Sequence, residues 1–462
     1  MYKFEKFISK LYIFNFPFKM FAPFAILGEI TFGLGDVASF IFCTIGIILA
    51  IINGRLHWGK SKSDKLFKQF IIIYFLCDIA SVIMALLLFK RCGYIAGENT
   101  VIATSKKILF SFAYIAFIYY CREIGGILTL DEIFSTIEKT INVCLVVGII
   151  QIGILYNISI FEAIYNAINS LFDAWTVTRV HQTGRIALLA NEPAYSAGFL
   201  GIIVFPYLLS KFLVKKNTVF DFLKLFILVV ILYFTKSTTG YVIFAVTIVF
   251  FVYYYVKNSS INTFNKGLLI VLVAFFVVFA YFLLKELNIF NDFMFVIEKL
   301  TSSENENSTD RKAIIVINLL ILKKFPLLGV GNGNQGFFYR ELAPVWAINS
   351  FTGARAYKNA ANVLFDGGPF WLAFISGYGL LGIILMVLFF KNSIINMKLY
   401  KNQFPLLYYF YILSLPILLV DGVAATLGEK QYFWFVLAIP MMLRLLSNNE
   451  MHSRNHFDIV EQ

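Results

Sequence analysis

The sequence predicts an all-α protein that crosses a membrane many times, and three observations carry this prediction. The 462-residue chain is 59% hydrophobic and 14% charged, whereas a soluble domain is about half apolar and about a quarter charged. Apolar runs close to the ~20 residues that a helix needs to cross a bilayer core recur along the whole chain. Lys and Arg gather in alternate short loops between these runs, which is typical of polytopic proteins.

Twelve apolar runs are expected to be transmembrane helices within one integral membrane domain, residues 1–462. Lys3, Lys6 and Lys10 precede the first run as in a signal peptide, but no small-residue cleavage site follows, so this run is interpreted as a retained helix. The polar segment 447–462 is predicted to be a disordered cytoplasmic tail. The expected spans are 13–33, 37–53, 69–89, 108–121, 140–157, 197–214, 219–235, 239–256, 267–284, 369–390, 404–420 and 431–447.

The short loops predict the orientation of the chain. Because basic loops stay on the cytoplasmic side, both termini are expected to be cytoplasmic. The loop 90–107 is an exception, since it is expected outside yet carries four basic residues; either the span 108–121 is wrongly bounded or this loop has another role. The basic residues on the predicted cytoplasmic side are Arg55, Lys60, Lys62, Lys65, Lys68, Lys215, Lys216, Lys257, Lys266, Lys391, Lys398 and Lys401.

Two larger external loops follow from this topology, at about 158–196 and 285–368, and both are expected to carry short helices. Residues 313–322 (AIIVINLLIL) are apolar over only ten positions, which predicts an interfacial or protein-buried helix rather than another span.

The long external loop is polarised in charge. Residues 286–310 hold six acids and one base, whereas the stretch from Arg311 to Lys358 holds seven bases and one acid, Glu341. Guanidinium groups bind phosphate or diphosphate with paired hydrogen bonds, so this half-loop is a candidate anion site. A solvated face, or contact with anionic headgroups, is the alternative. The seven bases are Arg311, Lys312, Lys323, Lys324, Arg340, Arg355 and Lys358.

The shorter external loop reads TRVHQTGRIALLANEPAYSAG over 178–198. Arg179 and Arg185 precede Glu192-Pro193, and His181 is the one histidine expected outside. A carboxylate near an arginine beside the bilayer can act as a general base. The alternative is an ion pair and a helix start, because Pro suits the first helical turn and Glu suits the N-terminal dipole.

Several other function classes lack sequence support. Residues 329–336 (GVGNGNQG) contain GxGxxG, but no strand–turn–helix unit surrounds it, so a glycine-rich turn that allows close backbone approach is expected. The five cysteines form no CxxC pair or His/Cys cluster, and no metal or cofactor site is predicted. The net charge of +12 lies mostly at the ends of apolar runs, which disfavours nucleic acid as a partner.

Acids within the spans could also carry function. Asp78 lies in the middle of an expected span, where a charge is costly, so it should be paired, protonated or functional. Glu29 and Asp36 lie near the outer end of the first span, from which they could reach an external site.

Four passages resemble the bacterial O-antigen polymerase and O-antigen ligase superfamily. They are GRIALLANEPAYSAGF (184–199), FTKSTTGYVIF (234–244), DRKAIIVINLLILKKFPLLGVGNG (310–333) and SGYGLLGIILMVLFF (376–390). Thr238 stands where the family often has arginine, and 357–370 (YKNAANVLFDGGPF) lacks the His-Asn that ligases carry near the end of the long loop. Asn359, Asn362 or Asp366 could fill part of that role, but the missing histidine favours a polymerase.

The resemblance implies a metal-independent glycosyl transfer at the periplasmic face of the bacterial inner membrane. A growing glycan on undecaprenyl diphosphate would pass to a new lipid-linked repeat unit. The alternatives are an O-antigen ligase or another lipid-linked glycosyltransferase, and a polysaccharide flippase or transporter. A transporter should show paired intramembrane charges and short loops on both faces, which this sequence lacks.

The resemblance also assigns roles to the candidate residues. Arg185 and Arg311 are expected on the diphosphate, and Glu192 is the nearest candidate for the base; Arg179, His181, Arg340, Arg355 and Lys358 are expected to contact substrate. The expected partners are the undecaprenyl-diphosphate-linked oligosaccharide and membrane lipid, with a chain-length regulator and a flippase implied by the family alone.

Overall fold

The computed structural model describes residues 2–18, 37–55, 59–95, 97–172, 176–190, 192–257, 306–348, 368–424 and 430–460. These residues form helices and no β-strand, which confirms the all-α prediction. The helices are α1 (Tyr2–Phe14), α2 (Val37–Ile52), α3 (Lys62–Cys92), α4 (Thr100–Ile127), α5 (Leu130–Leu155), α6 (Ser159–Phe172), α7 (Val177–Thr183), α8 (Pro193–Phe199), η2 (Leu200–Val204), α9 (Phe205–Leu213), α10 (Val219–Thr235), α11 (Thr238–Lys257), α14 (Glu306–Lys324), α15 (Gln335–Leu342), α16 (Val345–Ile348), α18 (Phe370–Leu399), α19 (Pro405–Ala424) and α20 (Gln431–Val460).

Seven helices in the described ranges are long and apolar enough to cross a membrane, so the protein is a multi-pass membrane protein. A shorter apolar helix covers Ala38–Ile52. The predicted span 267–284 and most of 13–33 lie outside the described residues. The predicted span 219–235 corresponds to the 17-residue α10. Helix α20 begins at residue 431, as predicted, but it continues to Val460 through most of the segment 447–462, which was predicted to be a disordered tail. The seven are Lys62–Cys92, Thr100–Ile127, Leu130–Leu155, Pro193–Leu213, Thr238–Lys257, Phe370–Leu399 and Pro405–Val423.

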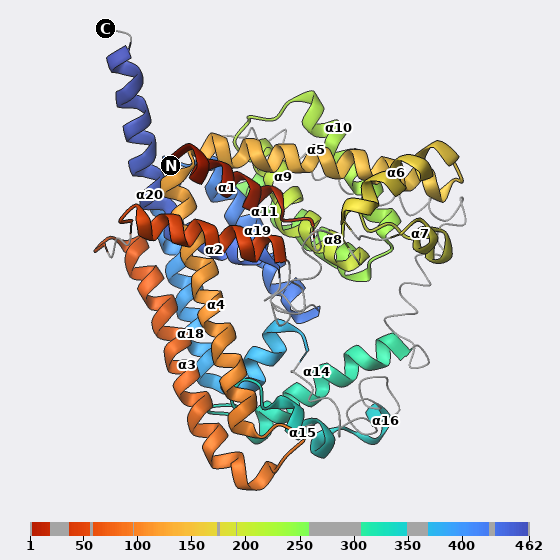
Figure 1. Cartoon of the computed structure of the whole chain (residues 1–462), viewed down its shortest axis with the longest axis vertical. Helices are drawn as coiled ribbons and strands as arrows, with labels where there is room; N and C mark the ends of the chain where they lie inside the picture. Colours follow the sequence, from red (N-terminus) through yellow and green to blue (C-terminus); the bar gives the residue numbers. More distant parts are fainter. Residues whose placement is uncertain are drawn as a thin grey trace.

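The long helices α3, α4, α18 and α20 lie side by side as one bundle (Figure 1). Helix α4 is twice as long as the predicted span 108–121: it has 28 residues and begins where the Asn99 side chain accepts a hydrogen bond from the Ile102 N–H (2.9 Å). The basic loop 90–107 is therefore mostly helix, because α3 extends to Cys92 and α4 begins at Thr100. The span was predicted too short because Lys106 and Lys107 interrupt its apolar pattern.

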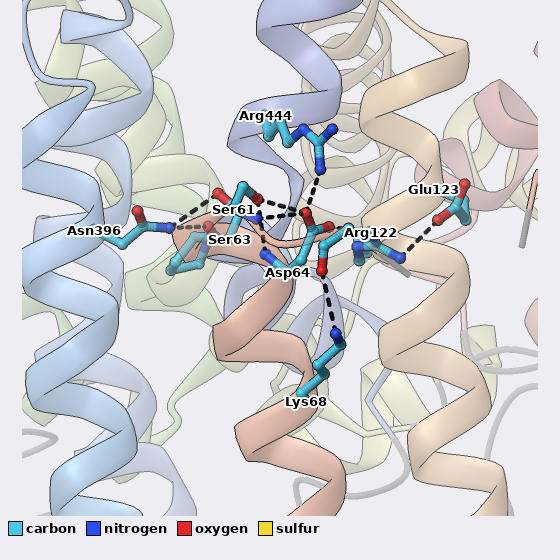
Figure 2. Close-up of polar contacts among 10 residues, drawn as sticks. Ser61, Ser63, Asp64, Lys68, Arg122, Glu123, Asn396 and Arg444 are labelled. Carbon is cyan, nitrogen blue, oxygen red and sulfur yellow. Dashed lines mark hydrogen bonds and ion pairs between the residues drawn. The ribbon is translucent and has the colours of Figure 1, made fainter. Parts of the chain in front are cut away.

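A buried charge cluster joins the four helices of this bundle near the start of α3 (Figure 2). The Asp64 carboxylate accepts a hydrogen bond from Arg122 of α4 (2.6 Å) and one from Arg444 of α20. Arg122 is only 2% exposed and also pairs with Glu123 at 3.0 Å. From α18, the Asn396 amide donates to Ser63 Oγ (3.1 Å). Because each charge in the cluster has an opposite partner, the buried ends of the helices are held in register.

Residues 326–333 contact α18 at a break in that helix, and we call this contact the dock. Gly379 has φ 60° and ψ −152° inside α18, which frees backbone groups there. The Val330 N–H donates to the Ser376 carbonyl (3.0 Å) and the Leu380 N–H donates to the Pro326 carbonyl (2.8 Å). A Cβ on Gly329, whose φ is +64°, would lie 2.4 Å from Ser376 O. This confirms the prediction that the glycine-rich stretch is a turn for close backbone approach.

Helix α14 packs on α18 beside this dock, at the lower end of the molecule in Figure 1. Its apolar side chains Ala313, Ile317 and Ile321 are buried, as expected for a protein-buried helix. The Asn318 amide donates to Tyr339 Oη (2.8 Å), and Ser376 Oγ donates to Asn318 Oδ1 (2.6 Å), so the buried polar groups of α14, α15 and α18 satisfy one another.

Two basic side chains, one from α3 and one from α14, hold α15 through the same carboxylate. Arg91, at the end of α3, pairs with Glu341 of α15 at 2.9 Å and lies over the Phe338 ring, with 5.7 Å to the centroid. Lys324 of α14 also contacts Glu341. Arg91 and Lys324, which are both expected outside, thus have a structural use. Within the bundle, Asp78 accepts a hydrogen bond from Ser111 Oγ at 3.0 Å, so this acid has a polar partner.

Candidate functional site

The Arg185 side chain lies where two turns meet. Helix α7 ends at Gly184, which has φ +60°, and the chain then runs beside the end of α10. The Ile186 N–H donates to the Phe234 carbonyl (3.1 Å), and Arg185 Nε donates to the Thr235 carbonyl (3.0 Å). The guanidinium is therefore half-buried and held in a fixed orientation by backbone of another helix.

The residues after Arg185 form a buried turn that is held from α5. Gln151 Oε1 accepts from the Leu188 N–H, and Gln151 Nε2 donates to the Leu188 carbonyl, each at 2.8 Å. Leu188 has φ +49°, a conformation that a branched side chain rarely adopts. Tyr165 of α6 also donates to the Leu188 carbonyl (3.2 Å). Because several hydrogen bonds hold Leu188 in this strained conformation, the backbone of this turn is fixed in position.

Glu192 begins the next helix. It is the N-cap of α8, with Pro193 at the first helical position, as the helix-start interpretation predicted. Its side chain is exposed and makes no capping hydrogen bond, and no ion pair to it is present among the described residues. The carboxylate is therefore presented at the surface, seven positions after Arg185, with oxygens able to accept a proton.

The two passages around Arg185 and Lys236 pack directly on each other. A Cβ on Gly240 of α11 would lie 2.8 Å from the Ala197 Cβ of α8, so α8 and α11 approach closely. Lys236 follows α10, and a Cβ on Gly184 would lie 3.7 Å from its Nζ. The site thus has two cationic side chains, Arg185 and Lys236, on adjacent turns.

A buried ion pair supports the other side of α8. Lys430 Nζ lies 2.9 Å from Asp421 Oδ2, and the two side chains are 6% and 1% exposed. Lys430 Nζ also lies over the rings of Tyr195 and Tyr432, with 5.7 and 5.9 Å to the centroids. A Cβ on Gly198 would lie 2.9 Å from Lys430 Nζ. The ion pair therefore lies directly against the helix that Glu192 begins.

The remaining predicted residues lie in other places. Arg179 and His181 are exposed on α7, where His181 Nε2 lies 3.0 Å from Glu162 Oε1 of α6. Arg311 is in α14 and Arg340 is in α15, and both helices lie in the lower half of Figure 1, below α7 and α8. The other candidates of the long loop and first span lie outside the described residues: Glu29, Asp36, Arg355, Lys358, Asn359, Asn362 and Asp366.

Sequence reasoning missed Lys236, Asp421 and Lys430. Each lies at the end of an apolar run, where a charge is usually interpreted as a membrane anchor. The sequence offered one indication of Lys236, because this residue lies within 234–244, one of the four passages that resemble the O-antigen polymerase and ligase superfamily. The described residues contain no group of three or more His, Cys, Asp or Glu side chains placed to hold a metal ion.

Comparison with known proteins supports the resemblance. The family model described as O-antigen ligase matches residues 223–387, from within α10 to within α18. This match is consistent with the superfamily of O-antigen polymerases and ligases, a class that transfers glycans between lipid-linked carriers and acceptors. Arg311 and Arg340 lie within the match, whereas Arg185 and Glu192 precede it. No curated protein matches the chain.

Proposed function

We propose that the protein polymerises undecaprenyl-diphosphate-linked oligosaccharide repeat units into O-antigen or another surface polysaccharide. The observation that carries this proposal is the half-buried Arg185, fixed by the Thr235 carbonyl on the segment that presents the exposed Glu192. A fixed guanidinium and a carboxylate on one short segment suit a leaving diphosphate and an acceptor hydroxyl. The lack of histidine in 285–368 favours polymerase over ligase.

The proposed reaction is a single displacement. Glu192 accepts the proton of the acceptor hydroxyl, and the oxygen forms a bond to the anomeric carbon of the growing glycan. The bond from that carbon to the diphosphate oxygen breaks, and undecaprenyl diphosphate leaves with the electron pair. Arg185 stabilises the charge that develops on the diphosphate, as preorganised donors do in other transfer reactions. Arg311 is the second cation in this proposal, with Arg179, His181, Arg340, Arg355 and Lys358 contacting other parts of the substrate.

The location of the reaction is part of the same proposal. The predicted orientation places both termini in the cytoplasm and Glu192 at the periplasmic face of the inner membrane. Polymer growth at that face would involve a flippase that delivers repeat units and a regulator of chain length.

An O-antigen ligase is the second candidate, and the description of the matching family model favours it. A ligase would transfer the same lipid-linked glycan to lipid A–core instead of to another repeat unit. The two candidates share the donor and differ in the acceptor, so an acceptor test separates them.

The test incubates purified protein in detergent with its host's undecaprenyl-diphosphate-linked repeat unit and resolves the products by gel. We expect a ladder spaced by one repeat, and a rate lower by about 10²–10³-fold for Arg185→Ala, which is typical when one charge-stabilising donor is removed. Arg185→Lys should retain part of the activity. Lys216→Ala, an exposed cation at the other end of α10, is the control and should match wild type.

Two outcomes would contradict the proposal. Transfer that appears only when lipid A–core is added would identify a ligase. Full activity in both Arg185→Ala and Arg311→Ala would remove the arginine-assisted mechanism.

A further inference from the structure

Helix α6 leaves the span α5 at a well-defined break. Asn157 has φ 59°, and the Ile158 N–H donates to the Gly153 carbonyl (3.1 Å), so α5 ends on a left-handed residue and the chain changes direction. Asparagine is one of the few residues that tolerate this conformation. A Cβ on Gly153 would lie 2.0 Å from Phe161 Cδ2, so the glycine lets the first turn of α6 pack against the last turn of α5.

Helix α6 has two apolar sides, and only one of them faces the protein. On the inner side, Tyr165 is fully buried and packs in one cluster with Phe161 and Ile168. The other apolar side is exposed, with Ile160 at 64% and Ile164 at 42%. The spacing of three and four residues places its members on one helical face. We call this face the outer stripe, and it consists of Ile160, Ala163 and Ile164.

The third side of α6 is polar. Asn166 is exposed there, and Glu162 Oε1 lies 3.0 Å from His181 Nε2 of α7. With 3.6 residues per turn, Asn166 lies about 120° from Ile160 around the helix axis. The 14 residues of α6 are too few to cross a bilayer core. A short helix with separate apolar and polar faces is typical of the membrane interface, where the apolar face enters the boundary between headgroups and acyl chains.

The outer stripe follows directly on the lipid-facing surface of α5. Val146 and Ile149 are exposed apolar side chains of this span, so lipid covers them in the membrane. Tyr156 is exposed just after the end of α5, on the same side as Ile149, and tyrosine is typical of the level of the headgroups. Ile160 comes four positions later. The surface that faces lipid on α5 therefore leads onto the outer stripe of α6.

We propose that α6 is an interfacial helix whose outer stripe binds the lipid bilayer. On its inner side, Tyr165 Oη accepts from Gln151 Nε2 (2.6 Å) and donates to the Leu188 carbonyl (3.2 Å). The turn at Arg185 then lies within about 10 Å, one helix diameter, of the bilayer surface. The inference rests on the proposed function only for the use of this position, which keeps the turn at the level of a lipid-linked diphosphate.

The experiment measures the depth of α6 in nanodiscs of phosphatidylcholine and phosphatidylglycerol. A fluorescent nitrobenzoxadiazole label is attached to one introduced cysteine at a time, in a Cys92→Ser background. The four other native cysteines are buried and do not react in the folded protein. The variants are Ile160→Cys and Ile164→Cys in the outer stripe, Asn166→Cys on the polar side as the matched control, and Val146→Cys within α5.

Two quenchers report the surroundings of each label. Lipids carry a nitroxide either near the headgroup or near the end of the acyl chain, and iodide quenches from water. We expect both stripe labels to be quenched best by the nitroxide near the headgroup, and the Val146 label by the deeper one. Iodide should quench the Asn166 label about threefold or more better than either stripe label, because the polar face of an interfacial helix stays in water.

Three other outcomes would overturn the inference. Equal iodide quenching of the stripe labels and the Asn166 label would place the outer stripe in water. Protection of the stripe labels from both quenchers would show that protein covers the stripe, either another part of this chain or a second copy. Stripe labels as deep as the Val146 label would make α6 part of the membrane core. Lipid contact at the stripe, in a protein that forms no glycan ladder, would instead refute the proposed function and leave the position of α6 intact.

Discussion

Two turns of this protein carry glycines and sequence motifs, yet they differ in what their polar groups do. In the dock between the long loop and α18, the backbone N–H groups all donate to protein acceptors. The N–H groups of the three residues 329–331 donate to the carbonyls of Phe325, Ser376 and Gly377, in that order. The Asn332 N–H donates to Ser81 Oγ, and the Gly333 N–H donates to Gln335 Oε1. The dock therefore fixes helices and offers no backbone donors to a ligand. At the Arg185 turn, by contrast, the side chains of Arg185 and Lys236 are half-buried, and the exposed carboxylate of Glu192 follows seven positions after Arg185.

The charges that support the two turns differ in the same way. The dock is held by Arg91 and Glu341, whose side chains are 47% and 44% exposed. The Arg185 region is supported by Asp421 and Lys430, which are almost fully buried. An exposed pair contributes little, whereas a buried pair is costly to form and more costly to break. The buried pair therefore constrains the geometry of the Arg185 region more than the exposed pair constrains the dock.

The largest expected effect comes from breaking this buried pair. Lys430→Met leaves the Asp421 carboxylate buried without its partner, which should lower the free energy of unfolding by about 3–5 kcal/mol. The double variant Asp421→Leu/Lys430→Met removes both charges and should recover most of that loss. Denaturation in detergent measures all three changes, with Asp421→Leu completing the cycle. Strictly additive losses would show that the two side chains do not act as a pair.

A smaller effect is expected at the dock. Gly329→Ala would place a Cβ 2.4 Å from Ser376 O at a positive φ, so we expect a loss of stability of about 1–3 kcal/mol from overpacking. Because the dock does not bind ligand, the rate of glycan transfer by the folded protein should stay at the wild-type value. Gly126→Ala in α4 is the control, since its nearest neighbour would be at an ordinary 3.7 Å. A Gly329→Ala protein of normal stability with slowed glycan transfer would reverse the comparison between the two turns.

These contacts also explain which parts of the molecule the sequence could predict. Apolar runs identify the spans because each helix must satisfy its own backbone in lipid. Their bounds are less certain where charges lie inside helices: Lys106 and Lys107 are part of α4, and the Arg91 partner Glu341 is 250 positions away. No local pattern contains such a pair.

The candidate site shows the same limit. Arg185 and Glu192 are in one short motif, so their residue types and spacing indicated a site. Lys236 joins them only because the end of α10 packs beside Gly184, and the ion pair of Asp421 and Lys430 joins them only through Gly198. These are tertiary contacts between segments that are separated by other helices. Predicting them requires the packing of helices, which periodicity alone does not give.

The smallest expected effect is a pH dependence of the dock. The hydrogen bond from Lys324, with the charge of Arg91, lowers the pKa of Glu341 below its ordinary value. Since the folded pKa lies below the unfolded value of about 4.3, this carboxylate stabilises the protein above that pH. The contribution is lost as the pH falls through the folded pKa. Thermal unfolding of wild type and Glu341→Gln from pH 7 to pH 3 should therefore show a small difference at neutral pH that disappears in acid. A difference that stays constant over this range would mean that Glu341 acts through packing, and the exposed charges would then have no part in holding the dock.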